Sequence, residues 1–305
     1  MNSDAIWQNE YPFTSRWHEA DGHRYHFISE GAGDQTILAV HGNPTWSFYW
    51  RNVVQRFSDS RRVVAVDHIG CGMSDKPQEY DYCLETHAAN LSSLIEAEDL
   101  RRITLLAHDW GGAIGLLALT KHVDRFERIV LLNTGAFPPP YVPWRIGVLR
   151  CPVLGPLAIR GLNAFAGPAV TMAMSRRSLS PEARAGLLAP YKNWADRVAI
   201  DRFVQDIPMS PSHRTWQPLE RLEAALPSLS HLPTMLIWGM KDWCFRPECM
   251  DRIQKSMPHA QTVPIADAGH YVMEDATEEV LDSIDSFFQS TDAPSATSAT
   301  SHPST

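Results

Sequence analysis

The chain has 305 residues, 44% of them hydrophobic and 20% charged, which allows a large buried core and excludes a wholly disordered chain. Its formal net charge of −8 disfavours a non-specific binder of nucleic acid or of an anionic membrane, because either would need a basic surface. The five cysteines are scattered and odd in number, which favours a reduced protein with neither a disulfide scaffold nor a zinc site.

The first half of the chain alternates short apolar runs with helical patterns. Runs rich in Val, Ile and Leu predict strands buried on both faces of a parallel sheet. These runs occupy residues 36–40, 63–66, 103–107 and 129–132. Residues 84–98 and 111–121 have the three- and four-residue apolar spacing of helices. Strands that alternate with helices in this way predict an α/β fold with a mainly parallel sheet.

The pattern changes at Gly135. Residues 135–212 contain no strand-like run, open with a cluster of prolines and continue in helical patterns, which predicts an inserted helical cap. Strand-like runs resume at 235–238 and 262–265, and an amphipathic helix is expected at 277–288. The sequence thus predicts a first core segment at 1–134, the cap at 135–212 and a second core segment at 213–289. Residues 290–305 are rich in Ser, Thr, Ala and Pro and predict a disordered tail.

The segment His108-Asp109-Trp110-Gly111-Gly112 follows one predicted strand and opens a helix. Small residues two positions before and after Asp109 are typical of a nucleophile elbow, a sharp strand-to-helix turn that exposes one side chain. The usual serine is replaced by aspartate. A carboxylate is ionised near neutral pH and can attack an electrophile directly, with formation of an ester on the enzyme. The alternative is that Asp109 only caps the helix.

Two further residues fit the roles of base and acid. His270 lies on a loop after the last predicted strand, where an elbow enzyme places its base. The strand after the elbow ends at Asn133, whose amide cannot stabilise an imidazolium. The next strand is followed by Asp242, which we expect to orient His270 and stabilise its cation. The alternative is that Asp242 pairs with a neighbouring basic residue, Lys241 or Arg246.

The loop His41-Gly42-Asn43-Pro44-Thr45-Trp46 follows the first of these strands. In elbow enzymes a backbone N–H from this loop and one from the residue after the nucleophile form the oxyanion hole, which predicts that role for Asn43 and Trp110. Their side chains also carry N–H donors and could hold a departing anion. In the alternative interpretation Asn43 is a turn residue and Trp110 packs under the cap.

These motifs resemble those of the haloalkane dehalogenases of the α/β-hydrolase superfamily, over roughly residues 11–288. The resemblance rests on the segments 41–46, 67–77, 108–112 and 269–270. It implies the α/β-hydrolase fold with an inserted helical cap, with Asp109 as nucleophile and His270 as activator of water. It also implies halide binding by Asn43 and Trp110. The acid at Asp242, together with Asn43, fits the third dehalogenase subfamily.

The same motifs, with cap segments at 163–166, 189–191 and 202–208 and the stretch 133–137, also resemble the β-lactone decarboxylases of long-chain olefin biosynthesis. The two families share the site residues, so the motifs do not separate them. The first expectation is the hydrolysis of a haloalkane to alcohol and halide through an alkyl ester on Asp109. Decarboxylation of a β-lactone by the same nucleophile is the alternative.

Other relatives fit less well. Epoxide hydrolases need two cap tyrosines, for which Tyr141 and Tyr191 are available, and fluoroacetate dehalogenases need arginines that are missing after Asp109. A non-catalytic ligand-binding hydrolase fold is the remaining alternative.

We expect no metal and no organic cofactor, a small apolar substrate, a halide product, no nucleic-acid partner and no membrane span. A homo-oligomer stays open. Because Met1-Asn2-Ser3-Asp4 lacks the pattern of a secretory signal, we expect a cytoplasmic protein.

Overall fold

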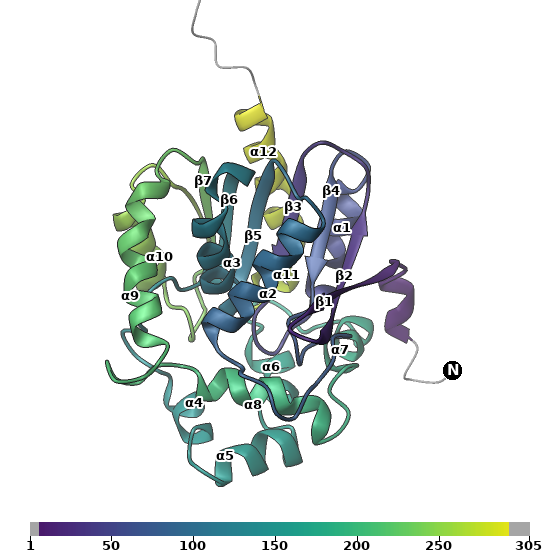
Figure 1. The fold of residues 1–305 in the computed structure, drawn as a ribbon, viewed down its shortest axis with the longest axis vertical. Helices are drawn as coiled ribbons and strands as arrows, with labels where there is room; N and C mark the ends of the chain where they lie inside the picture. Colours follow the sequence, from purple (N-terminus) through teal and green to yellow (C-terminus); the bar gives the residue numbers. More distant parts are fainter. Residues whose placement is uncertain (1–5, 293–305) are drawn as a thin grey trace, which may run out of the picture.

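The structure, a computed structural model, describes residues 6–292. Its centre is one eight-stranded sheet with the order β1-β2-β4-β3-β5-β6-β7-β8 (Figure 1). The strands are β1 (Ser15–Ala20), β2 (His23–Glu30), β3 (Thr36–Val40), β4 (Arg62–Val66), β5 (Ile103–Asp109), β6 (Phe126–Thr134), β7 (Thr234–Gly239) and β8 (Gln261–Ile265). Strand β2 runs antiparallel to β1 and β4, and the pairs from β4 to β8 are parallel. The predicted α/β architecture with a mainly parallel sheet is confirmed.

Helices cover both faces of the sheet because successive strand residues point to opposite sides. Leu38 and Val40 of β3 belong to the core cluster that includes residues of α2, α3, α9 and α10, whereas Ile37 and Ala39 belong to the cluster that includes residues of α1, α11 and α12. These helices are α1 (Arg51–Phe57), α2 (Leu84–Ala97), α3 (Trp110–Lys121), α9 (Trp216–Ala225), α10 (Pro247–Ser256), α11 (Val272–Asp275) and α12 (Thr277–Asp292). Short turns of helix are η1 (Ile6–Glu10), η2 (Ser47–Trp50), η3 (Val123–Arg125), η5 (Ala195–Arg197) and η6 (Leu226–Leu229). Burial on both faces explains why the parallel strands are continuous apolar runs.

A group of helices between β6 and β7 lies together at one end of the molecule, the lower end in Figure 1. They are α4 (Trp144–Leu149), α5 (Leu154–Pro156), the π-helical turn η4 (Leu157–Gly161), α6 (Ala166–Met172), α7 (Pro181–Leu188) and α8 (Val198–Gln205). The opposite end carries the last turns of α12. Among the residues that the structure describes, no helix is both long enough and apolar enough to cross a bilayer.

Two elements differ from the sequence-based expectation. The hairpin of β1 and β2 was not predicted, because β1 has mostly polar, partly exposed residues. Its turn at Asp21-Gly22, where both residues have positive φ, is the pattern that could have found it. Helix α12 continues to Asp292 rather than ending at 288, and so enters the stretch assigned to the tail. Residues 293–305 of that predicted tail lie outside the described residues.

Candidate active site

The elbow is a tight turn between β5 and α3. Asp109 ends the strand with φ 54° and ψ −130°, and the helix begins at the next residue. A Cβ atom on Gly111 would lie 2.2 Å from the backbone oxygen of Val40, and one on Gly112 would lie 2.0 Å from Thr134 Oγ1. The turn therefore requires glycine at both positions, and it holds Asp109 in a conformation that non-glycine residues rarely adopt.

The two oxygens of the Asp109 carboxylate have different environments. The backbone N–H of Asn43 donates to Oδ1 at 2.6 Å, and the backbone N–H of Trp110 also bonds to this carboxylate. Oδ2 lies 3.7 Å from Nε2 of His270. Burial raises the pKa of Asp109 to about 6, although the charge of His270 and the two N–H groups oppose the rise. The side chain is thus largely ionised at neutral pH, with Oδ2 turned toward the imidazole.

His270 is held by a chain of polar contacts that begins at Asn133. Its Nδ1 lies 2.8 Å from Oδ2 of Asp242, and Nδ2 of Asn133 donates to the same oxygen at 2.9 Å. The backbone N–H of Cys244 donates to Oδ1 of Asp242 at 2.6 Å. Burial lowers the pKa of His270, but the charges of Asp242 and then Asp109 outweigh it, so this pKa lies above its ordinary value. A cationic imidazole between two carboxylates is the form that this arrangement favours.

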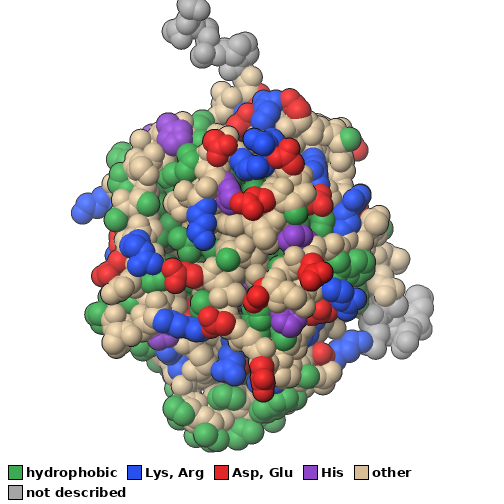
Figure 2. Space-filling view, in the orientation of Figure 1, with side chains coloured by type: hydrophobic (Ala, Val, Ile, Leu, Met, Phe, Trp, Pro, Cys, Tyr) green, Lys and Arg blue, Asp and Glu red, His purple; other side chains and the backbone are tan. Residues whose placement is uncertain are grey.

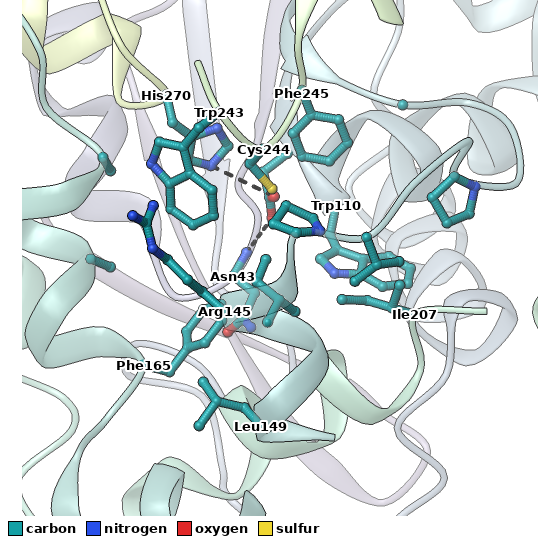
Figure 3. Close-up of a pocket in the computed structure, with 18 of the residues that line it drawn as sticks. Asn43, Trp110, Arg145, Leu149, Phe165, Ile207, Trp243, Cys244, Phe245 and His270 are labelled. Atoms are coloured by element: carbon teal, nitrogen blue, oxygen red, sulfur yellow. Dashed lines mark hydrogen bonds and ion pairs between the residues drawn. The ribbon is translucent and has the colours of Figure 1, made fainter. Parts of the chain in front are cut away.

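The carboxylate and the imidazole open into a cavity of about 410 Å³ between the core and the helices that follow β6. Figure 3 shows Asn43 and His270 joined by dashed lines to the same carboxylate from two sides, with Trp110 beside it. The other lining residues are mostly apolar and come largely from the inserted helices, among them Ile146, Leu149, Phe165, Ile207 and Leu219. The cavity suits a substrate with apolar arms and one reactive centre.

The side chains of Asn43 and Trp110 both line this cavity. Nδ2 of Asn43 donates to the backbone oxygen of Ile200 at 3.3 Å, and because an amide nitrogen carries two N–H groups, a second donor is left for an anion. Oδ1 of Asn43 is buried without a hydrogen-bond partner among the described residues. The indole of Trp110 packs against Phe203 of α8, with ring centroids 5.6 Å apart. The structure therefore brings Asn43, Asp109, Trp110 and His270 to one cavity. The fifth predicted site residue, Asp242, lies behind His270 and bonds its Nδ1.

Two positioning residues were missed by the sequence analysis. Asn133 was rejected as the acid, yet it is fully buried, and besides bonding Asp242 it accepts from the backbone N–H of Gly239 at 2.8 Å. Nε2 of His108 lies 2.9 Å from the backbone oxygen of His270 and holds that residue's loop. His108 lies directly before Asp109 at the end of β5, and Asn133 lies near the end of β6. The sequence shows that both residues lie near strand ends, but only the structure shows which groups they bond.

The two cap tyrosines are committed to backbone acceptors. The hydroxyl of Tyr141 donates to the backbone oxygen of Cys244 at 2.5 Å, and that of Tyr191 donates to the backbone oxygen of Thr45 at 3.2 Å. Neither hydroxyl is left to protonate a substrate oxygen, which disfavours the epoxide hydrolase alternative.

The chain is similar to known proteins over most of its length. A family model described as the alpha/beta hydrolase fold matches residues 35–277. A cis-3-alkyl-4-alkyloxetan-2-one decarboxylase from Shewanella oneidensis is 39% identical, covering 92% of this chain and 90% of that protein. One from Xanthomonas campestris is 38% identical, covering 86% and 91%. Haloalkane dehalogenase 2 from Mycobacterium tuberculosis is 32% identical, covering 90% and 94%.

Solved structures agree on the fold. The haloalkane dehalogenase DatA from Agrobacterium tumefaciens superposes with a TM-score of 0.83 at 24% identity, covering 91% of this chain and 97% of that one. At this identity the likeness concerns the fold alone, and it matches the architecture expected from the sequence.

Proposed function

The chain belongs to the alpha/beta hydrolase fold family, and within it we propose that the protein decarboxylates β-lactones that carry alkyl groups on both ring carbons. The observation that carries this proposal is the higher identity to two decarboxylases, 39% and 38%, than to the dehalogenase at 32%. It reverses the order given by the motifs alone. The apolar cavity around one carboxylate is suited to a small polar ring with two alkyl arms.

In the first step Oδ2 of Asp109 attacks the saturated ring carbon that is bonded to the ring oxygen, and not the carbonyl carbon. The carbon–oxygen bond breaks, and its electron pair stays on the oxygen, which becomes part of a carboxylate on the neighbouring carbon. The product of this step is an alkyl ester of Asp109. In this proposal the side-chain N–H groups of Asn43 and Trp110, which line the cavity, stabilise the departing oxygen as its charge develops. The two backbone N–H groups keep Oδ1 fixed, so that Oδ2 faces the cavity.

In the second step the bond to the carboxylate carbon breaks and CO₂ leaves. The released electron pair forms the carbon–carbon double bond, and the ester bond to Oδ2 breaks to restore the Asp109 carboxylate. No water and no proton is consumed, and the balance requires no metal or organic cofactor. An apolar cavity favours this step because the charge of the carboxylate is dispersed as CO₂ forms. Inversion in the first step followed by anti elimination converts a cis lactone into a cis alkene.

Haloalkane hydrolysis is the second candidate, and the distance between His270 and Asp109 favours it. Nε2 lies 3.7 Å from Oδ2, and Asp242 stands behind the imidazole, as a base that activates water against an Asp109 ester would require. Asp109 would displace the halide, which Asn43 and Trp110 would bind. The backbone N–H groups of Asn43 and Trp110 would then hold the oxyanion on Oδ1 during hydrolysis. In lactone decarboxylation His270 and Asp242 only orient and stabilise the carboxylate.

A paired assay separates the two candidates. Purified protein is given a cis-dialkyl β-lactone in one vessel and a dibromoalkane in another, with Asp109→Asn as the control in both. We expect rapid formation of the cis alkene and CO₂, little bromide release, and neither product with the variant. Rapid bromide release with a slow or absent reaction of the lactone would reverse the assignment.

A further inference from the structure

Large apolar side chains are exposed mainly on one part of the molecule. Among the described residues, nine of the eleven large hydrophobic side chains that are exposed lie between residues 144 and 209. Six of them lie on α4, α5 and η4 or directly next to these elements, and we call these six the cap tip. They are Trp144 (74% exposed), Val148 (62%), Val153 (71%), Leu154 (65%), Leu157 (51%) and Leu162 (82%). Figure 2 shows hydrophobic side chains gathered at this lower end of the molecule. A patch of this kind on a monomer usually marks a surface that is covered in use.

The cap tip lies beside the entrance of the cavity. Helix α4 turns Ile146 and Leu149 inward to line the cavity, while Val148 faces outward. Trp144 both lines the cavity and belongs to the tip, and Met172 of α6 lines the cavity and is 38% exposed. Apolar surface is thus continuous from the outside of the molecule into the substrate cavity.

The charge around the cap tip is positive, in contrast to the chain as a whole. No Asp or Glu occurs between Glu127 and Glu182, and in this stretch Arg145, Arg150 and Arg160 lie in or directly after the cap-tip helices α4 and η4. The other arginines of the stretch lie elsewhere: Arg128 is buried against Asp292 of α12, and Arg176 pairs with Asp267 and Glu279. Residues 135–212 contain nine Lys or Arg against four Asp or Glu, whereas the rest of the chain contains eighteen against thirty-one. The net charge of −8 therefore conceals one basic end.

We propose that the cap tip docks on an anionic lipid surface and presents the mouth of the cavity to the bilayer. Exposed Trp, Leu and Val with flanking arginines are the combination that binds the interface between lipid headgroups and acyl chains. The arginines supply the attraction to anionic headgroups. A second protein chain would need no such basic surround unless it were itself acidic. The docking rests on the exposed residues alone. Its use, uptake of a substrate with alkyl arms from the lipid phase, rests on the proposed function.

Vesicle co-sedimentation of the full chain without substrate tests the docking independently of the reaction. We expect the protein to bind vesicles of phosphatidylcholine and phosphatidylglycerol at about a 7:3 ratio, and to bind pure phosphatidylcholine about tenfold less. Binding to the mixed vesicles should weaken at high salt, because screening reduces the arginine contribution.

Two variants and a control locate the surface. The double variant Leu154→Asp with Leu162→Asp should bind the mixed vesicles at least about tenfold more weakly. It should turn over a short-chain lactone like the wild type, since neither residue lines the cavity. Val153→Gly removes one apolar side chain where φ is 67°, a conformation that glycine adopts freely, so weaker binding by this variant cannot be ascribed to unfolding. Trp17→Asp, at the exposed Trp17 of β1, should bind like the wild type.

Three results would overturn the proposal. The first is that the wild-type protein stays in the supernatant with both vesicle compositions, and the second is that the double variant binds vesicles as well as the wild type. Sedimentation velocity without lipid gives the third: a wild-type dimer that the double variant converts to monomer, with no binding to vesicles, would assign the surface to a second copy of the chain.

Discussion

The buried carboxyl group of Asp109 links the proposed chemistry to pH. Burial raises its pKa to about 6, and only the ionised form can attack carbon. Because the folded-state pKa is raised, the reactive form is present above pH 6 and is lost as the pH falls through this value. We expect kcat for lactone decarboxylation to be half-maximal near pH 6 and level above pH 7.

The same profile distinguishes the two candidate reactions. Hydrolysis of an ester also needs a neutral His270, whose pKa is raised, so a hydrolytic rate would continue to increase above about pH 6.5. Steady-state rates between pH 5 and pH 9 give the answer. A rate that is unchanged between pH 7 and pH 5 would contradict the role of the Asp109 carboxylate.

Asn133 shows what a single residue contributes to the order of the site. Its fully buried amide makes hydrogen bonds to Asp242 and to both backbone groups of Gly239. We expect Asn133→Ala to lower the free energy of unfolding by about 2 kcal/mol, since buried partners lose their bonds. The exposed Asn193, whose side chain caps Ala195, is the matched control, and Asn193→Ala should cost less than about 1 kcal/mol. Equal losses of unfolding free energy for the two variants in urea would show that the hydrogen bonds of Asn133 stabilise the fold no more than those of an exposed residue.

Among the elements, the loop after β3 sets the position of the nucleophile. A Cβ atom at Gly42 would lie 2.0 Å from Oδ1 of Asp109, so Gly42→Ala must displace the carboxylate or the loop. We expect kcat to fall about a hundredfold, as is typical when a reacting group is misplaced by about 1 Å. Gly147→Ala in α4 is the control, since nothing lies within 4 Å of its added Cβ. Similar kcat values for the two variants would argue against this close approach.

The end of α12 carries a prediction about stability. Asp292 pairs with Arg61 and with Arg128, whose side chain is only 5% exposed. We expect Asp292→Ala to lower the free energy of unfolding by about 1–2 kcal/mol, because a mostly buried guanidinium loses one of its two carboxylate partners among the described residues and keeps only Glu127. Asp282, which pairs with Arg56 at an exposed site, is the control, and Asp282→Ala should change it by less than about 0.5 kcal/mol. Thermal unfolding of both variants measures the difference.

The elements that sequence predicts best are the strands that form continuous apolar runs. Six strands, β3 to β8, were located to within about three residues at each end, and β3 to β7 are almost wholly buried because both faces of the sheet are covered. The β1–β2 hairpin escaped because β1 is largely exposed and the buried centre of β2 is flanked by polar residues. The elbow and His270 were found because reactive residue types stand on the turns and loops that follow predicted strands. The chain Asn133–Asp242–His270 is only half visible in sequence, because the contact of Asn133 depends on how two neighbouring strands align.

At the scale of the whole molecule, a net charge does not describe how the charges are distributed. The net charge of −8 disfavours a non-specific binder of anionic surfaces, yet residues 135–212 carry an excess of five basic residues and the rest of the chain an excess of thirteen acidic ones. Composition cannot show this, because it does not record that the acid-free stretch folds into one end with exposed apolar side chains. The division of the chain into core and cap at 135 and 212, the cytoplasmic location and the oligomeric state remain predictions.

The central claim is that Asp109 forms a covalent bond to substrate carbon, and its alkyl ester can be trapped. A bromoalkane lacks the carboxylate that would allow CO₂ to leave, so its ester on Asp109 can only be hydrolysed, and His270→Phe removes the base for that step. Trapping needs only one displacement per protein molecule, which is compatible with little bromide release. After prolonged incubation with a bromoalkane, peptide mass spectrometry of this variant should therefore find the alkyl group on the peptide that contains Asp109. Bromide release with Asp109 unmodified, or with the alkyl group on another side chain, would contradict the account.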